Sequence, residues 1–241
     1  MRIGNNIAFR RILREGSGES VTPATYKGIT LKTLFFLFLT VASAIGGLIF
    51  GSFYPEAYVI MLVVASIATL ILSIISMISI KACKITGSLY CVAEGLLIGI
   101  ISYAVSFLYE GAVSVAILST ILVFAVVTLL YVSNIVKVNN KFMKFLSIFA
   151  FSFIIFMVFY SIYSWITGSW AGFGLSLLIS IVSIFLATLY LFFDLEKIRQ
   201  IVEGGYDKSL EWNAAFGLAF TLIWLYVEIL RLVLIVADRR S

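Results

Sequence analysis

The sequence predicts an all-α, polytopic membrane protein with seven transmembrane helices. Its 241 residues are 62% hydrophobic and only 12% charged, and the mean hydropathy is +1.13. A soluble domain averages roughly 45–50% apolar and about 25% charged residues. The apolar residues gather in runs of about 20–25, enough for a helix to cross a hydrocarbon core roughly 30 Å thick.

Residues 1–30 are predicted to form a cytoplasmic segment, and residues 31–241 a single transmembrane domain. The segment is polar and basic, and its residues 7–13 are compatible with a short amphipathic helix on anionic headgroups. The apolar run that follows is too long for the h-region of a secretory signal peptide. We therefore expect it to stay in the membrane as the first span.

The spans are expected at residues 34–53, 57–80, 85–108, 112–136, 142–165, 171–193 and 214–237. The first and third contain the small-xxx-small patterns GLIFG (47–51) and GLLIG (95–99), which predict close helix contacts. The fifth has no glycine and is dense in Phe and Tyr, which favours a position that faces lipid.

The lysines and arginines predict the orientation. Apart from Arg231 and the two C-terminal arginines, they lie before the first span or in and beside the loops after the second, fourth and sixth spans, whereas the other loops contain none. The positive-inside rule therefore places the N-terminus in the cytoplasm. The net charge of +5 follows from this distribution and does not indicate nucleic-acid binding. Seven crossings leave Arg239 and Arg240 outside, so either the rule is broken locally or the last span does not cross fully.

The residue types exclude several functions. The chain has no histidine, which removes Ser-His-Asp catalysis, His-ligated zinc and haem, and pH sensing by imidazole. Cys83 and Cys91 form neither a CxxC motif nor a disulfide framework, and we expect them to be small buried residues. We predict no cofactor and no enzymatic activity. An intramembrane aspartyl protease would carry a Gly-x-Gly-Asp segment, and none surrounds Asp194 or Glu228. A secondary transporter would show broken helices marked by paired Gly or Pro interruptions, and none is visible in the sequence.

Carboxyl groups are the candidate functional residues. Asp194 ends the sixth apolar run, in LYLFFDLEKIR (189–199), and Glu228 lies inside the seventh, in WLYVEILRLVL (224–234). Glu94 lies in the third span. An acid at membrane depth costs roughly 2.5–3.5 kcal/mol, so it is usually retained for a use or neutralised by a partner.

Each acid also has a purely structural interpretation. Glu228 and Arg231 are spaced i and i+3 and can neutralise one another. Glu94 can hydrogen bond a neighbouring helix as the neutral acid. Asp194 can sit at the inner end of its helix beside Lys197, although the helix dipole disfavours an anion there.

The functional interpretation couples Asp194 to Glu228. Two acids close together in a low dielectric resist ionising together, so they share a proton at low pH and separate, or take up a cation, at higher pH. Their oxygens are the ligands that Ca²⁺ prefers, which makes both residues candidate Ca²⁺ contacts. The spacing is unfavourable, because Glu228 lies roughly 20 Å into its span. The two acids can meet only if the sixth helix runs on past the membrane plane or the seventh starts earlier.

Several segments of the chain resemble the Bax inhibitor-1 family of membrane proteins, most closely its bacterial branch. They are YKGITLKTL (26–34), CVAEGLLIGIIS (91–102), KVNNKF (137–142), YLFFDLEKI (190–198), EWNAAFGL (211–218) and WLYVEILRL (224–232). The match covers nearly everything from Tyr26 onward, and the segments around Asp194 and Glu228 are the specific ones.

The resemblance implies a seven-helix fold with the final helix central, a bacterial cytoplasmic membrane as location, and a pH-sensitive Ca²⁺ leak controlled by two buried acids. Asp194 matches the first acid. Glu228 matches the second, where the best-studied bacterial relatives carry aspartate. In those relatives an arginine at the inner end of the second helix latches the closed state onto an acid. The nearest bases here are Lys81 and Lys84, which lack the guanidinium fork.

We therefore expect a passive, proton-regulated Ca²⁺ leak channel. Asp194 and Glu228 would sense ions and pH, with Lys81, Lys84 or Arg231 as latch or partner, and Ca²⁺ would be the permeant ion. Glu94 is a candidate accessory acid without an assigned role. The alternative is a membrane regulator or scaffold that binds another membrane protein, such as a quality-control protease, through its N-terminal segment.

Overall fold

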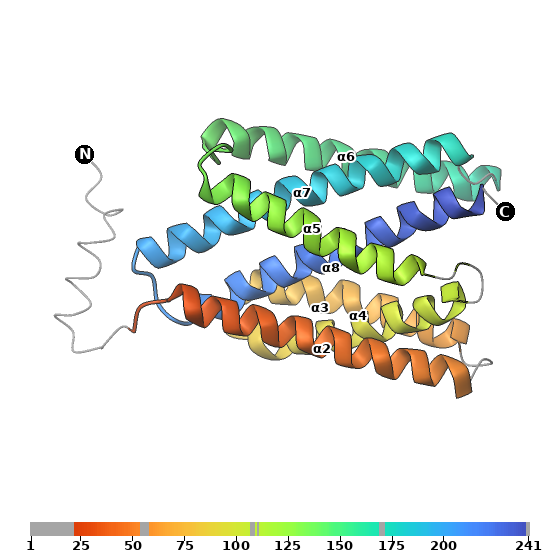
Figure 1. The fold of residues 1–241 in the computed structure, drawn as a ribbon, viewed down its shortest axis with the longest axis horizontal. Helices are drawn as coiled ribbons and strands as arrows, with labels where there is room; N and C mark the ends of the chain where they lie inside the picture. Colours follow the sequence, from red (N-terminus) through yellow and green to blue (C-terminus); the bar gives the residue numbers. More distant parts are fainter. Residues whose placement is uncertain (1–21, 54–57, 107–108, 110, 169–171, 240–241) are drawn as a thin grey trace. The chain divides into compact units, whose positions relative to one another are not determined.

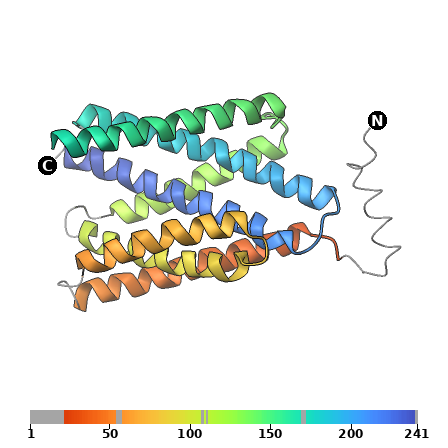
Figure 2. The same cartoon turned by 180° about the vertical axis from the view of Figure 1, so that it is seen from behind.

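The computed structural model describes residues 22–53, 58–106, 109, 111–168 and 172–239, so the helix expected over residues 7–13 lies outside the described part. The described residues form seven helices and, apart from one isolated bridge, no β-structure. The helices are α2 (Tyr26–Phe53), α3 (Tyr58–Ile78), α4 (Cys83–Ser106), α5 (Ala112–Val132), α6 (Asn140–Thr167), α7 (Phe173–Glu203) and α8 (Leu210–Asp238) (Figures 1 and 2). All seven are long and apolar enough to cross a membrane, which confirms the predicted fold class.

The helices belong to two compact units. Unit 1 consists of Met1–Ile100 and Glu196–Ala219, and unit 2 of Ile101–Leu195 and Phe220–Ser241. Unit 1 thus contains α2, α3, most of α4, the end of α7 and the first part of α8. Unit 2 contains α5, α6, most of α7 and the rest of α8. The candidate acids on α7 and α8 both belong to unit 2.

Glycines bring α2 and α4 together inside unit 1. A Cβ atom on Gly99 would lie 2.0 Å from the carbonyl oxygen of Ala44, and one on Gly47 would lie 2.5 Å from the carbonyl oxygen of Leu96. The backbones approach this closely only because no side chain stands between them. The two small-xxx-small patterns of the sequence therefore mark one interface, in which the first and third spans contact each other.

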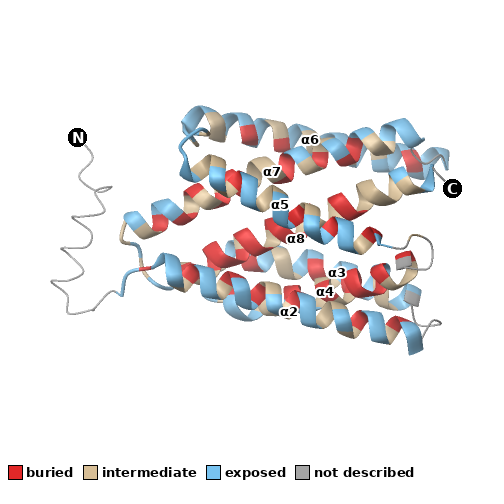
Figure 3. Ribbon diagram, viewed as in Figure 1, coloured by how far each residue is buried: buried red, intermediate tan, exposed pale blue. Residues whose placement is uncertain are grey.

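Burial differs strongly between the helices (Figure 3). Buried residues are most frequent along α4, α7 and α8 and least frequent along α6, which agrees with the lipid-facing position expected for the fifth span. The buried side of α6 presents Leu146 and Ala150 to Leu186 of α7, and Tyr190 and Trp224 pack against this cluster. Both cysteines are buried and free, as predicted.

Helix ends follow local sequence signals. Asn139 is the N-cap of α6, and its side chain accepts a hydrogen bond from the backbone N–H of Phe142. Gly168 closes α6 with φ 64°, and Gly205 follows α7 with φ 63°, a conformation that residues with a Cβ rarely adopt.

Removing the cap of α6 should destabilise the protein modestly. Asn139→Ala leaves the N–H of Phe142 without its acceptor, and we expect the free energy of unfolding to fall by about 1 kcal/mol. Thermal unfolding in detergent measures the effect. Asn139→Ser retains an acceptor and should stay near the wild-type midpoint; equal midpoints for both variants would contradict the cap.

The C-terminal end of α8 contacts the connections expected on the outer side. The hydroxyl of Tyr109, between α4 and α5, donates a hydrogen bond of 3.0 Å to Asp238. The guanidinium of Arg239 lies 4.5 Å from the ring centroid of Phe173, at the start of α7. These contacts favour a last span that crosses fully, with the charge of Arg239 partly offset by an aromatic ring.

Candidate functional site

The helices that carry the candidate acids are longer than the apolar runs that predicted them. α7 continues to Glu203, so Asp194 lies nine residues inside its end and not at residue 193, where the sixth span was expected to stop. α8 begins at Leu210 and not at residue 214. The predicted ends were wrong because hydropathy marks the part of a helix that suits lipid, whereas backbone hydrogen bonding continues beyond it.

Asp194 is buried and hydrogen bonded to α8. The residue is only 5% exposed, and its Oδ2 atom accepts a hydrogen bond of 2.6 Å from the hydroxyl of Thr221 on α8. The contact forms because α7 continues beyond Asp194 and α8 begins before its apolar run, so that Asp194 and Thr221 lie at a similar distance from the turn between the two helices. Its position well inside α7 also removes the interpretation of Asp194 as a residue at the helix end.

Glu228 of α8 is a half-buried acid of unit 2. Its Oε2 atom is buried without a hydrogen-bond partner in the described structure, and the guanidinium NH1 of Arg231 lies 3.8 Å away. The expected i,i+3 ion pair is thus present, but at a separation too long for a hydrogen bond. The side chain of Arg231 is 42% exposed, so water weakens the attraction. Glu228 thus keeps one buried carboxylate oxygen without a hydrogen-bond partner in the described structure.

The two acids lie at different levels along one face of α8. Thr221, which contacts Asp194, precedes Glu228 by seven residues, and seven residues at about 100° each return to the same face of a helix. The same seven residues rise by roughly 10.5 Å. The structure therefore places two acids about two turns apart along α8, Asp194 at the level of Thr221 and Glu228 itself, and we call these two positions the acidic stations.

These acids do not make a resident metal centre. No group of three or more His, Cys, Asp or Glu side chains that could hold a metal ion occurs among the described residues. Ca²⁺ takes roughly six to eight oxygen ligands, and one carboxylate at each level supplies two at most. Asp194 and Glu228 could therefore contact a passing hydrated cation, and each would do so separately.

The remaining candidate residues lie in unit 1. The ammonium of Lys84 lies 5.4 Å from the ring centroid of Trp212, and Lys81 is exposed in the turn between α3 and α4. The carboxyl group of Glu94, on α4, lies close to the hydroxyl of Thr69 on the neighbouring α3.

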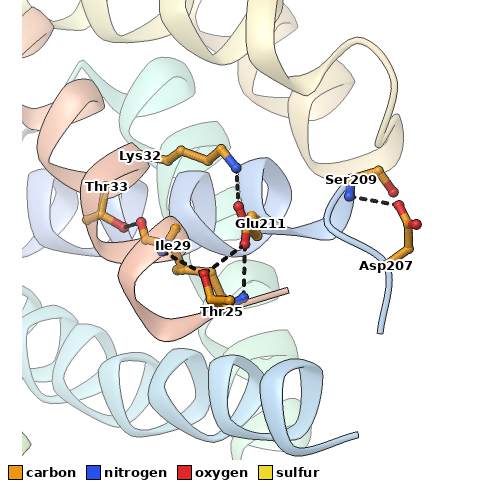
Figure 4. Close-up of polar contacts among 8 residues, drawn as sticks. Thr25, Ile29, Lys32, Thr33, Asp207, Ser209 and Glu211 are labelled. Atoms are coloured by element: carbon orange, nitrogen blue, oxygen red, sulfur yellow. Dashed lines mark hydrogen bonds and ion pairs between the residues drawn. The ribbon is translucent and has the colours of Figure 1, made fainter. Parts of the chain in front are cut away.

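A polar cluster around Glu211 was not identified from the sequence (Figure 4). Glu211, in the first turn of α8, is completely buried, and it accepts hydrogen bonds from the backbone N–H (2.9 Å) and hydroxyl (3.2 Å) of Thr25. The ammonium of Lys32 forms an ion pair with its other oxygen. Gly28 makes room for the carboxylate, since a Cβ there would lie 2.4 Å from it.

The N-terminus of α2 explains why this cluster forms. Thr25 is the N-cap of α2, since its hydroxyl accepts a hydrogen bond of 3.0 Å from the N–H of Gly28. In a capping box, an acid three residues after the cap would return a hydrogen bond to the N–H of the cap residue. Here that position is Gly28, and the missing acid is supplied by Glu211, 186 residues away.

The comparison with protein families agrees with this architecture. A family model described as Bax inhibitor 1 like matches residues 5–238. A comparison with curated proteins gives no match. The family match spans all seven apolar helices, both acidic stations and the cluster around Glu211. The chain is therefore a multi-pass membrane protein that belongs to the Bax inhibitor 1 like family.

Proposed function

We propose that this protein is a passive, proton-regulated leak channel for Ca²⁺, with Asp194 and Glu228 as its ion-contacting and pH-sensing residues. The observation that carries the proposal is the placement of two acids along one face of α8. Asp194 of α7 is buried and hydrogen bonded to Thr221, and Glu228 of α8 is half-buried, with one buried oxygen that lacks a hydrogen-bond partner in the described structure. Placing such groups in apolar helices is costly, so they are usually retained for a use or neutralised by a partner. The resemblance to a family of pH-sensitive Ca²⁺ leaks points the same way.

The two stations give protons and cations the same binding groups. When ionised, Asp194 and Glu228 attract a cation that enters between the helices of unit 2. When protonated, they carry no charge, and the protonated Asp194 can itself donate a hydrogen bond to the hydroxyl of Thr221. Cation passage therefore depends on pH. Because each level offers a single carboxylate, binding is weak enough for the ion to leave again.

Arg231 sets the state of the deeper acid. Its guanidinium is close enough to attract Glu228, but too far to satisfy Oε2 by hydrogen bonding. A cation at Glu228 would compete with this side chain, which is already partly exposed and can move aside. The ion pair then acts as a counter-charge while the site is empty.

Calcium flux into vesicles that contain the purified protein tests the proposal. With a Ca²⁺ indicator inside and equal pH on both sides, we expect flux down the Ca²⁺ gradient that is larger at alkaline than at acidic pH, because the ionised carboxylates attract the cation. Flux that requires an imposed proton gradient would indicate exchange. Flux equal to that of protein-free vesicles at every pH would overturn the proposal.

A further inference from the structure

Three consecutive residues at the start of α8, Glu211-Trp212-Asn213, reach the ends of the four other helices of unit 1. Successive side chains of a helix point about 100° apart, so three in a row span roughly 200° around its axis. Such a set can contact helices on opposite sides at once. The contacts below involve the start of α2, the end of α3, the start of α4 and the end of α7.

Glu211 completes the N-terminus of α2. It accepts from the backbone N–H of Thr25, one of the donors that a helix start leaves unsatisfied, and its negative charge lies at the positive end of the helix dipole. Lys32, one turn further along α2, neutralises that charge.

Asn213 completes the C-terminus of α3. Its Nδ2 donates to the carbonyl oxygens of Ser76 (3.2 Å) and Met77 (3.4 Å), which belong to the last turn of α3 and lack partners within it. Its Oδ1 accepts a hydrogen bond of 3.1 Å from the ammonium of Lys197, near the end of α7. One amide therefore connects α3 to α7.

Trp212 binds the start of α4. Its ring lies near the ammonium groups of Lys32 (5.1 Å) and Lys84 (5.4 Å), so it links α2 and α4 through two cations. Its carbonyl oxygen accepts a hydrogen bond of 3.5 Å from the thiol of Cys83, the first residue of α4. Cys83 is completely buried at this contact.

We propose that Glu211-Trp212-Asn213 forms a clasp that opens and closes, and that its opening separates the first turn of α8 from the ends of α2, α3 and α4. The contacts are ion pairs, amide hydrogen bonds and cation–π contacts to helix ends, all of which water can replace when the helices part. Because the cost of desolvation offsets much of the Coulombic attraction, the buried Lys32–Glu211 ion pair adds little net stability to the closed arrangement. The inference concerns contacts inside unit 1 and does not depend on the proposed function.

Cys83 reports on this opening because its thiol reacts only when the clasp exposes it. In a Cys91→Ala background, modification of Cys83 by N-ethylmaleimide should be slow in the otherwise wild-type protein. Glu211→Gln removes the charge and keeps the shape, whereas Asn213→Leu removes the hydrogen bonds and nearly keeps the volume. We expect each to accelerate the modification by roughly tenfold or more, as expected for a contact group that loses its charge or hydrogen bonds.

Glu203→Gln is the matched control. Glu203 is exposed at the end of α7 and also accepts a hydrogen bond from α2, from the hydroxyl of Tyr26 at 3.3 Å. It lies outside the clasp, so its modification rate should equal that of the wild type.

Cys91 distinguishes local opening from unfolding. It is completely buried two turns further along α4, and in a Cys83→Ala background it should stay protected in the clasp variants. Acceleration at Cys83 alone supports the clasp, whereas acceleration at both cysteines, or at neither, overturns it. The assay does not depend on ion flux, so absence of Ca²⁺ flux would overturn the proposed function and leave the clasp intact.

Discussion

Asp194→Asn should weaken the pH dependence of the Ca²⁺ flux and keep the flux closer to the value that the wild-type protein shows at acidic pH. Asparagine has the size of a protonated aspartic acid and can still accept the hydrogen bond from Thr221, but it carries no charge at any pH. Because the ionised acid attracts a cation and the amide does not, we expect the flux of this variant to fall below that of the wild type at alkaline pH. Flux into proteoliposomes at a series of symmetric pH values measures it.

Glu228→Gln should remove the second station in the same way. Since Glu228 lies about two turns from Thr221, the two substitutions should act partly independently, and the double variant should show a weaker pH dependence of flux than either single variant. Asp207→Asn, in the turn between α7 and α8, changes an acid that lies outside the apolar helices and should leave the profile unchanged. Unchanged profiles in both Asp194→Asn and Glu228→Gln would remove the basis of the pH-sensing role.

Gly99→Ala should strongly destabilise unit 1. The added Cβ would lie 2.0 Å from the carbonyl oxygen of Ala44 and 2.9 Å from the backbone N of Leu48, so α2 and α4 would have to separate. Backbone atoms cannot rotate away as a side chain can, and we expect a loss of about 3 kcal/mol, at the upper end of overpacking effects. The midpoint of thermal unfolding in detergent measures this loss.

Gly46→Ala provides the matched control on the same pair of helices. Its Cβ would meet only the Cδ2 atom of Leu96, at an ordinary contact distance of 3.9 Å. Alanine favours a helix over glycine by roughly 1 kcal/mol, so this variant should be neutral or more stable. If Gly99→Ala were as stable as Gly46→Ala, the close approach of α2 and α4 would be refuted.

The seven apolar helices, the low burial of the fifth and close packing at the glycine patterns could all be predicted from the sequence. Each depends on the residues of a single segment of about 20 residues, because transfer of a helix into lipid depends on its own side chains. Asp194, Glu228 and Glu94 were noticed for the same reason, since a carboxyl group stands out in any apolar run. The pairing of the two glycine patterns with each other came only from the structure.

The helix ends were predicted less well. Asp194 looked like a residue at the end of its span, and the structure places it nine residues inside α7. Polar residues of α7 beyond Leu195 continue the helix outside the apolar run, where hydropathy gives no signal. That extension, together with the earlier start of α8, brings Asp194 to Thr221.

The amino-acid sequence alone identifies the apolar segments that are long enough to cross a membrane and the acids that they carry. Tertiary structure decided which groups neutralise or cap one another. Glu211 lies in a polar stretch between two apolar runs of the sequence, yet it is completely buried because Thr25 and Lys32, far away along the chain, supply the donors that a buried carboxylate requires. The physical reason is that partition into lipid is a property of one segment, whereas burial of a charge depends on partners that only the packed helices bring together.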